Sequence, residues 1–228
     1  MSKQVNGSLF LRWSNQSQNQ NQTTEPKSNN GPAVGIDLGL MNFAVLSDGT
    51  MLKNPHHFRR LEDKIVLHQR QLSNKQKGSK NRGKARLKVA RVHEKIANAR
   101  KDYLHKTANF ILSKYSLIAM EELQPKKMAM QGHAKGINDA AWGMFANILC
   151  YKAERAGSRV VFVNPRQTSQ ICSRCGSNVQ KSLYERTHIC NLCGLSLDRD
   201  LNAAVNILKK VNELPGEPRE VTPVEMTQ

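Results

Sequence analysis

The sequence has few acidic residues for its number of basic ones, few aromatic residues and no long apolar run. Lysine and arginine outnumber aspartate and glutamate 35 to 18, which gives a net charge of +17. This excess predicts attraction to a polyanion, most commonly nucleic acid. No segment approaches the roughly 18 to 20 continuous apolar residues that span a bilayer, and no apolar signal segment follows the N-terminus. We therefore expect a cytoplasmic protein that contacts nucleic acid and no membrane.

Cysteine is also scarce, and its spacing argues against a disulfide framework, which a reducing compartment does not favour. Four of the five cysteines form two Cys-x-x-Cys pairs, CSRCG and CNLCG: Cys172, Cys175, Cys190 and Cys193. Four thiolates give Zn²⁺ a closed tetrahedral shell without an open position, so the predicted zinc is structural. The glycine after each pair is expected to relieve the backbone where N–H groups approach sulfur.

Two residues near these pairs have simpler interpretations. His188 lies close to Cys190, but four cysteines already complete a tetrahedral shell. We therefore interpret His188 as a surface residue or a nucleic-acid contact. Cys150 lies in an apolar helical run and is expected to be a small buried side chain.

Composition separates the ends of the chain from its middle. Residues 1–32 are rich in Gln, Asn and Ser, which predicts disorder apart from one strand-like stretch, Ser8–Ser14. Residues 33–53 alternate like strands, and the Asp-Gly pair in SDGT favours a hairpin with a type I′ turn. The tail, residues 212–228, is rich in Pro and Glu and is expected to be unpacked.

Residues 59–113 have helical periodicity and predict two helices that pack as an antiparallel hairpin. The connecting segment SNKQKGSKNRGK holds glycines that should break the helices and charges that cannot be buried. The expected packing stripes are Leu61, Ile65 and Leu72 in the first helix, and Val89, Val92, Ile96, Ala99 and Tyr103 in the second.

A strongly basic run lies within this hairpin. From Lys75 to Lys101 there are eleven Lys or Arg residues and one acid. A solvated helix face is one interpretation. The excess is too one-sided for salt-bridge pairing, however, so it favours phosphate contact. The predicted nucleic-acid-binding residues are Lys75, Lys77, Lys80, Arg82, Lys84, Arg86, Lys88 and Arg91.

The remaining segments alternate between strand and helix. YSLIAMEELQ, residues 115–124, and SRVVFVNP, residues 158–165, predict short buried strands. A helix is expected at about 137–156, with Trp142, Phe145 and Leu149 on one face and Gly157 as its C-cap. A last helix spans Leu201–Val211. Together these elements predict an α/β domain with a mixed sheet and flanking helices.

Four acidic residues stand out at three places in the predicted elements. Asp37 shares one strand face with Gly35 and Gly39, which leaves room for a hydrated metal and a phosphate, although a plain edge strand also fits this pattern. Glu121 ends an apolar strand, where a helix or turn acid is the simpler interpretation. Asp198 and Asp200 open the last helix, and either can cap it.

Within the last pair, Asp198 caps well, which leaves Asp200 free to point elsewhere. Carboxylates from separate elements, in a base-rich chain, are what Mg²⁺- or Mn²⁺-dependent phosphodiester chemistry requires. The candidate set for the catalytic metal is therefore Asp37, Glu121 and Asp200.

Four motifs together resemble one protein family: GIDLGLMNFAVLSDG, IAMEEL, AERAGSRVVFVNPRQTSQICSRCG and CNLCGLSLDRDLNAAVNIL. From about Ala33 to Lys210 the chain resembles the C-terminal half of TnpB proteins. These are accessory proteins of bacterial insertion sequences and relatives of type V CRISPR effectors, so transposition is the implied setting.

The resemblance implies a RuvC-like nuclease of RNase H fold that is split by a Cys₄ zinc ribbon and cuts DNA under RNA guidance. Its catalytic acids fall on Asp37, Glu121 and Asp200, and its ribbon ligands on the four paired cysteines. The implied division is a RuvC-like core over 33–170, which includes the basic helical hairpin insertion, a zinc ribbon over 171–195 and a last RuvC helix over 196–211.

Family members usually carry a long N-terminal half that holds guide RNA and reads a short DNA motif, and here only SLFLRWS resembles a remnant of it. We therefore expect an N-terminally truncated protein, with a homologous full-length protein as a further partner. The leading hypothesis is an Mg²⁺-dependent endodeoxyribonuclease domain with DNA and guide RNA as partners. The alternatives are a non-cleaving, zinc-containing nucleic-acid-binding fragment that assists or regulates a full-length homologue, and a decayed transposon fragment.

Overall fold

A computed structural model describes residues 29–123, 134–182 and 185–212. The expected strand at Ser8–Ser14, most of the predicted disordered N-terminus and the tail from residue 213 lie outside these residues. None of the helices in the described part is long and apolar enough to cross a membrane.

A five-stranded mixed sheet, in the order β3-β2-β1-β4-β5, organises the fold. Strand β1 pairs antiparallel with β2 and parallel with β4, and β5 extends the parallel side. The mixed character predicted from the sequence is thus confirmed. The strands are β1 (Ala33–Leu38), β2 (Asn42–Leu46), β3 (Met51–Lys53), β4 (Leu117–Glu121) and β5 (Arg159–Val163).

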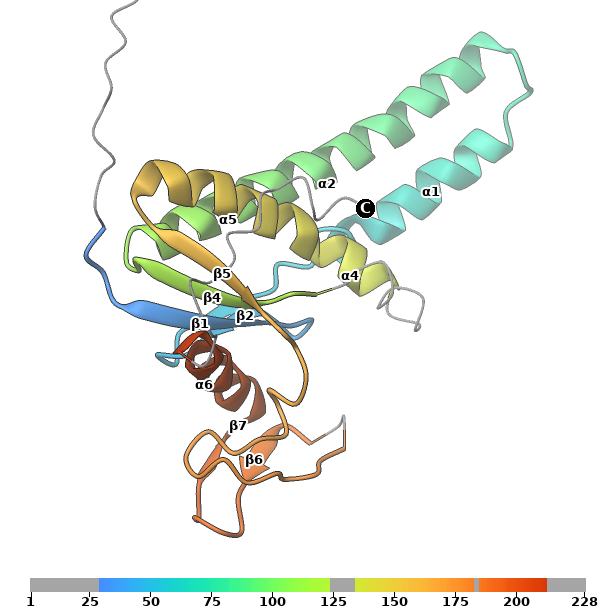
Figure 1. The fold of residues 1–228 in the computed structure, drawn as a ribbon. Coiled ribbons are helices and arrows are strands. Elements are labelled where there is room, and N and C mark those ends of the chain that lie inside the picture. The colour runs from blue at the N-terminus through green and yellow to red at the C-terminus, as the bar shows by residue number, and fades with distance from the viewer. Residues whose placement is uncertain (1–28, 124–133, 183–184, 213–228) are drawn as a thin grey trace, which may run out of the picture.

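Helices cover both faces of this sheet, α2 and α5 on one side and α6 on the other (Figure 1). The hairpin of α1 and α2 projects beyond the sheet, and a small two-stranded sheet of β6 and β7 lies beside the start of α6. The further elements are η1 (Arg59–Leu61), α1 (Glu62–Ser73), α2 (Lys80–Leu112), α4 (Ala134–Ala140), α5 (Trp142–Ala156), β6 (Thr187–Ile189), β7 (Ser196–Asp198) and α6 (Arg199–Asn212).

Two apolar layers hold the sheet between its helices. The larger layer packs Phe43 and Ile118 against Leu104 of α2 and Phe145 of α5, all of them fully buried. The smaller layer, under α6, holds Ala119, Val161, Val163, Ile207 and Val211. Burial of each large apolar side chain stabilises the fold by about 1.5 to 3 kcal/mol, so α6 is fixed on its own face of the sheet.

The predicted helical hairpin is confirmed, with two differences. The chain turns at Gly78, whose φ is 82°, and Ser79 caps α2 by accepting a hydrogen bond from the Arg82 N–H. Gly83 was expected to break the helix, but it lies inside α2 and leaves the helix continuous. The second half of α2 is more than an insertion, because it supplies Leu104 and Ile111 to the main core.

One turn prediction and one helix prediction need correction. In the β2–β3 hairpin only Gly49 has positive φ, at 89°, so the turn is not type I′. The Leu46 N–H bonds the Thr50 carbonyl instead, and Asp48 accepts a hydrogen bond from the Thr50 N–H.

The predicted helix at 137–156 is two helices, because Ala141 adopts a left-handed conformation with φ of 52° between α4 and α5. The predicted Gly157 C-cap, with φ of 68°, is confirmed.

Ordered packing begins before the predicted boundary at Ala33. The Asn29 amide donates to the carbonyls of Leu112 and Tyr115 and to the Ser158 hydroxyl, at 2.9 to 3.0 Å. One side chain therefore joins the end of α2 to the start of β5. A short polar side chain with several backbone partners leaves no apolar signal in the sequence.

Candidate active site and metal centre

Asp37 and Glu121 occupy neighbouring strand ends. Strands β1 and β4 run parallel, and their register pairs Ile36 with Met120. Asp37 and Glu121 are the next residues along each strand, so both acids lie at the carboxyl edge of the sheet. Glu121 also accepts a hydrogen bond from the Thr168 hydroxyl at 2.5 Å, which holds its carboxylate from the loop after β5.

Helix α6 brings the third acid to this edge by crossing directly over β1. A Cβ atom at Gly35 would lie 2.1 Å from the Ala204 carbonyl oxygen and 2.8 Å from the Leu208 backbone nitrogen. Only glycine permits this approach. The expectation that Gly35 leaves room for a metal and a phosphate is therefore wrong, since the α6 backbone fills that room. Asp200 stands in the first turn of the helix so placed.

Electrostatics ties the three acids into one cluster. Burial raises the pKa of Asp37 well above its ordinary value of 3.8, and the negative charges of Glu121, Asp200 and, least of these, Asp198 raise it further against the opposing charge of Arg199. Burial also raises the pKa of Glu121, against the opposing effects of the Thr168 hydrogen bond and the Lys210 charge. An acid whose pKa is raised by neighbouring carboxylates favours a cation beside it. We name Asp37, Glu121 and Asp200 the acidic cluster.

The two aspartates of DRD have different partners. Asp198 accepts hydrogen bonds from the backbone N–H groups of Asp200 and Leu201, at 2.9 and 3.1 Å. It is the N-cap of α6, as the sequence predicted. Asp200 instead contacts Arg199 at 3.2 Å and Arg186 at 3.5 Å.

The acidic cluster is more open than a closed single-ion site. In the described residues, ligand atoms of three or more His, Cys, Asp or Glu side chains all come within 4.8 Å of one another only at the four cysteines. The ligand oxygens of Asp37, Glu121 and Asp200 therefore do not all lie within 4.8 Å of one another, although the charges of Glu121 and Asp200 raise the pKa of Asp37.

Two asparagines that sequence reasoning missed attach α6 to the segment on both sides of the first cysteine. Asn202, fully buried, accepts from the Ser173 N–H and donates to the Ile171 carbonyl, both at 2.9 Å. Asn206, one turn later, donates to the carbonyls of Thr168 and Ile171. The available signal was an asparagine pair at i, i+4 on the apolar face of LNAAVNIL. This loop also carries the Thr168 hydroxyl that bonds Glu121.

The sulfur atoms of the four cysteines lie close together, where the two Cys-x-x-Cys turns, here called knuckles, meet. Sulfur–sulfur distances are 3.6 Å for Cys172 with Cys193 and for Cys175 with Cys190. Each knuckle closes with a glycine N–H donating to the first cysteine carbonyl at 2.9 Å. Gly176 and Gly194 have φ of 75° and 71°, so the predicted need for glycine is confirmed. The group can hold a metal ion, and four thiolates are the donor set that Zn²⁺ prefers.

The interpretation of His188 as a surface residue is wrong. His188 is fully buried in β6. Its Nδ1 contacts the Lys181 amine, and burial together with the Lys181 charge lowers its pKa. A strand of three residues offered too little alternation to reveal this. Cys150 is buried as predicted, and burial raises the pKa of its thiol to about 11.

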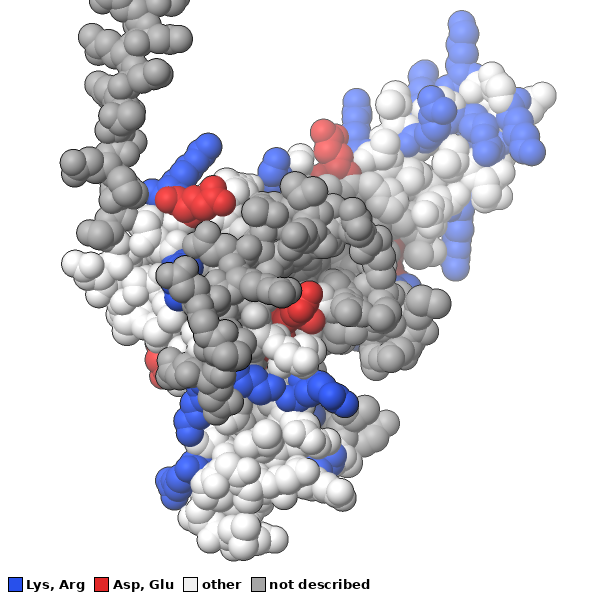
Figure 2. All heavy atoms as spheres, viewed as in Figure 1, with Lys and Arg blue, Asp and Glu red and all other residues white. Residues whose placement is uncertain are grey.

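The predicted nucleic-acid-binding residues lie in the connection between α1 and α2 and along the first three turns of α2. Seven of the eight are exposed, and basic side chains cover this end of the hairpin (Figure 2). Arg82 differs, because its guanidinium donates to the carbonyls of Leu72 and Lys75 at 3.1 and 2.9 Å. Arg82 therefore satisfies two carbonyl groups at the C-terminal end of α1 and in the connection that follows it.

Comparisons with known proteins agree with this arrangement. The family model described as "Probable transposase" matches residues 16–131, just over half of the chain, and the model "Cas12f1-like, TNB domain" matches residues 142–207. A protein named "Putative RNA-guided DNA endonuclease" from Streptomyces pristinaespiralis is 39% identical over 82% of this chain and 47% of its own length.

A TnpB-like protein of Methanocaldococcus jannaschii is 32% identical over 72% of this chain and 58% of its own length. The chain thus spans about half the length of the curated relatives it matches. The cryo-EM structure of a Cas12f1–sgRNA–target DNA complex aligns over 77% of this chain and 49% of that one, with a TM-score of 0.55 and 19% identity. That likeness confirms the predicted RuvC-like fold, and the family match shows that the chain belongs to the TnpB family.

Proposed function

We propose that this chain contains the catalytic domain of an Mg²⁺- or Mn²⁺-dependent endodeoxyribonuclease that acts under RNA guidance. The observation that carries the proposal is the acidic cluster. Asp37, Glu121 and Asp200 come from three separate elements, yet the charges of Glu121 and Asp200 both act on Asp37. The names of the relatives support the same activity, since one is called an RNA-guided DNA endonuclease. DNA and a guide RNA are the proposed partners, and a homologous full-length protein is a further one.

The acidic cluster would hold the divalent ions. Such ions activate water, stabilise the leaving oxygen of a phosphodiester and need no protein general base. The chain's own residues prepare the place. Thr168 orients the Glu121 carboxylate, and Asp198 fixes the first turn of α6 by capping it. Burial first, and then its acidic neighbours, destabilise Asp37 as a carboxylate, so a bound cation would stabilise the charged form.

We also propose that Cys172, Cys175, Cys190 and Cys193 hold a structural Zn²⁺. Both knuckles attach to α6 through β7 and through the Asn202 hydrogen bonds. The zinc ribbon, at residues 171–195, would therefore fix the start of the helix that carries Asp200. The basic helical hairpin, within residues 59–113, would contact nucleic-acid phosphates next to the RuvC-like core at 33–170, and 196–211 would be the last RuvC helix.

A second candidate function is nucleic-acid binding without cleavage. One observation favours it: Asp200 already contacts the cations of Arg186 and Arg199. A carboxylate neutralised in this way is a weaker metal ligand.

Nicking of supercoiled plasmid by the purified chain, with and without co-purified RNA, tests both functions. With Mg²⁺ or Mn²⁺ we expect the wild type to nick DNA and Asp37→Ala and Asp200→Ala to be inactive. Asp63→Ala, an exposed acid of α1, is the matched control and should retain activity. Cleavage that persists in Asp37→Ala rejects the acidic cluster as the catalytic site. Tight, salt-dependent DNA binding without cleavage by the wild type supports the second function.

A further inference from the structure

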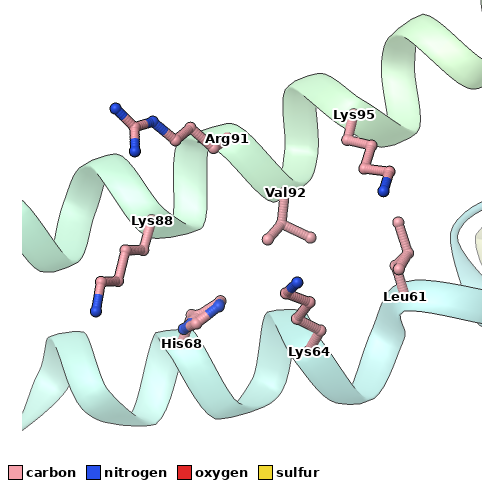
Figure 3. Close-up of a pocket in the computed structure, with 7 residues that line it drawn as sticks. All are labelled: Leu61, Lys64, His68, Lys88, Arg91, Val92 and Lys95. Carbon is pink, nitrogen blue, oxygen red and sulfur yellow. The ribbon is translucent and has the colours of Figure 1, made fainter.

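A groove between α1 and α2 has no part in the acidic cluster. Its volume is about 430 Å³. Figure 3 shows Lys64 and His68 pointing from α1 toward α2, and Lys88 and Lys95 extending from α2 toward α1, with Val92 between them. The complete lining is Leu61, Lys64, His68, Lys88, Arg91, Val92 and Lys95.

Helical spacing explains why one groove collects these side chains. Lys64 and His68 stand four residues apart on α1, while Lys88 and Lys95 stand seven apart on α2, so each helix turns one stripe inward. Val92 is buried, and it packs with Ile65 and Ile96 in the apolar contact that joins the helices. The groove thus has an apolar floor and two cationic rims on rigid elements.

The rims are not neutralised by acids. In the described part of the chain, Lys64, Lys88, Arg91 and Lys95 make no salt bridge with a carboxylate.

The nearby acids do not line the groove. Glu62 pairs with Lys135 at 2.6 Å, and Asp63 and Glu94 are exposed outside the lining. Lys64 of α1 faces Lys88 and Lys95 of α2 across the groove (Figure 3). Like charges placed close together repel, and an anion between them relieves the repulsion.

We propose that this groove binds a single strand of nucleic acid, with phosphates between the cationic rims and a sugar or base against Leu61 and Val92. A single strand can offer its phosphates and its base faces to the same groove. A duplex stacks its bases inside and offers mainly backbone to the rims. A cavity of this size holds about one or two nucleotides. The proposal needs no cleavage, so its test does not depend on whether the acidic cluster is catalytic.

Two triple variants of equal charge test the proposal. Lys64→Gln with Lys88→Gln and Lys95→Gln removes the lysines of the rims, whereas Lys53→Gln with Lys101→Gln and Lys114→Gln removes three exposed lysines outside the groove and outside the predicted nucleic-acid-binding set. Fluorescence anisotropy with a short single-stranded DNA, a short RNA and a duplex measures binding over a salt series. All six lysines are exposed, and circular dichroism verifies the fold.

For the rim variant we expect single-strand affinity to fall about tenfold or more. Its log–log salt slope should shrink by about 2, since three phosphate contacts are lost. The control variant should lose no more than about threefold. Equal losses in both variants, or a rim variant that loses as much affinity for duplex as for single strand, would overturn the proposal.

A local probe separates groove contact from general attraction. Histidine NMR signals should shift on adding the single strand for His68, which lines the groove, and not for His93, an exposed residue of the same hairpin outside it. Assignment by His68→Gln identifies the signal. A shift of His93 without one of His68 would place the strand elsewhere and overturn the proposal.

Discussion

Arg186 lies with its guanidinium 3.5 Å from the Asp200 carboxylate, so the segment that folds around the cysteines reaches the acidic cluster directly. The Arg186 carbonyl also accepts a hydrogen bond from the Arg199 N–H at 2.7 Å. Both contacts cross from the β6 side of the knuckles to the first turn of α6. The segment around the cysteines thereby places the Arg186 guanidinium, in addition to that of Arg199, beside the Asp200 carboxylate.

Removing this cation should improve metal binding at the acidic cluster. Arg186 competes with a divalent ion for the same carboxylate, so we expect Arg186→Gln to tighten Mn²⁺ binding by about threefold to tenfold in calorimetric titration. Its side chain is half exposed, so the free energy of unfolding should change by less than about 1 kcal/mol. Arg155→Gln, an exposed change on α5, is the control. Unchanged or weaker Mn²⁺ binding in Arg186→Gln would contradict the competition.

The crossing of α6 over β1 should make Gly35 intolerant of a side chain. In Gly35→Ala the new methyl group meets the Ala204 carbonyl at 2.1 Å, so α6 must move. We expect a loss of about 2 to 4 kcal/mol in the free energy of unfolding by urea. Gly83→Ala adds the same atom to α2 where nothing lies within 4 Å and should stabilise by up to about 1 kcal/mol. Equal effects of the two changes would contradict the close approach at Gly35.

The contrast between these glycines indicates what sequence reasoning could reach. The cysteine knuckles, the Asp198 cap and the hairpin at 59–113 follow from patterns within a few turns of chain, so they were predictable. The role of Gly35 depends on α6, which is more than 160 residues away in sequence. No local pattern carries such a contact.

The same reason explains the residues that were missed. Thr168, Asn202 and Arg186 act through partners on other elements, with bonds to Glu121, Ile171 and Asp200. Polar residues of this kind also occur on ordinary surfaces. For His188 the prediction from the sequence was wrong. A polar residue next to the predicted metal ligands was expected to be exposed, but the structure buries it.

Stability should depend on pH in a direction set by Asp37. Its folded-state pKa is raised above 3.8, so the folded state keeps a proton that the unfolded state has released. Without divalent metal, the contribution of Asp37 to stability is therefore fully present below its unfolded pKa and is lost as pH rises through its folded pKa. At neutral pH, Asp37→Asn should raise Tm by about 3 °C or more. Added Mg²⁺ should stabilise the wild type and not this variant.

Asp48 provides a control of opposite sign. Burial acts to raise its pKa, but hydrogen bonds from Tyr115 and Thr50 lower it overall, so its charged form stabilises the fold above the unfolded pKa. Asp48→Asn should therefore lower Tm at neutral pH. A fall in Tm for Asp37→Asn as well would contradict the repulsion inferred within the acidic cluster.

Loss of the metal proposed at the four cysteines should loosen the segment at residues 171–195 and leave the sheet domain folded. The knuckles have little apolar core of their own, since the exposed side chains include Ile189 and Leu192, so metal binding supplies their folding free energy. We expect about one zinc ion per chain by elemental analysis. Cys193→Ser should lose it and become sensitive to trypsin at Arg174 and Arg186, with helical circular dichroism retained because α2 and α5 bury a separate core. Cys150→Ala, which removes a buried thiol outside the site, should keep the metal and resist trypsin. A ribbon that stays resistant after Cys193→Ser would contradict a structural role for the metal.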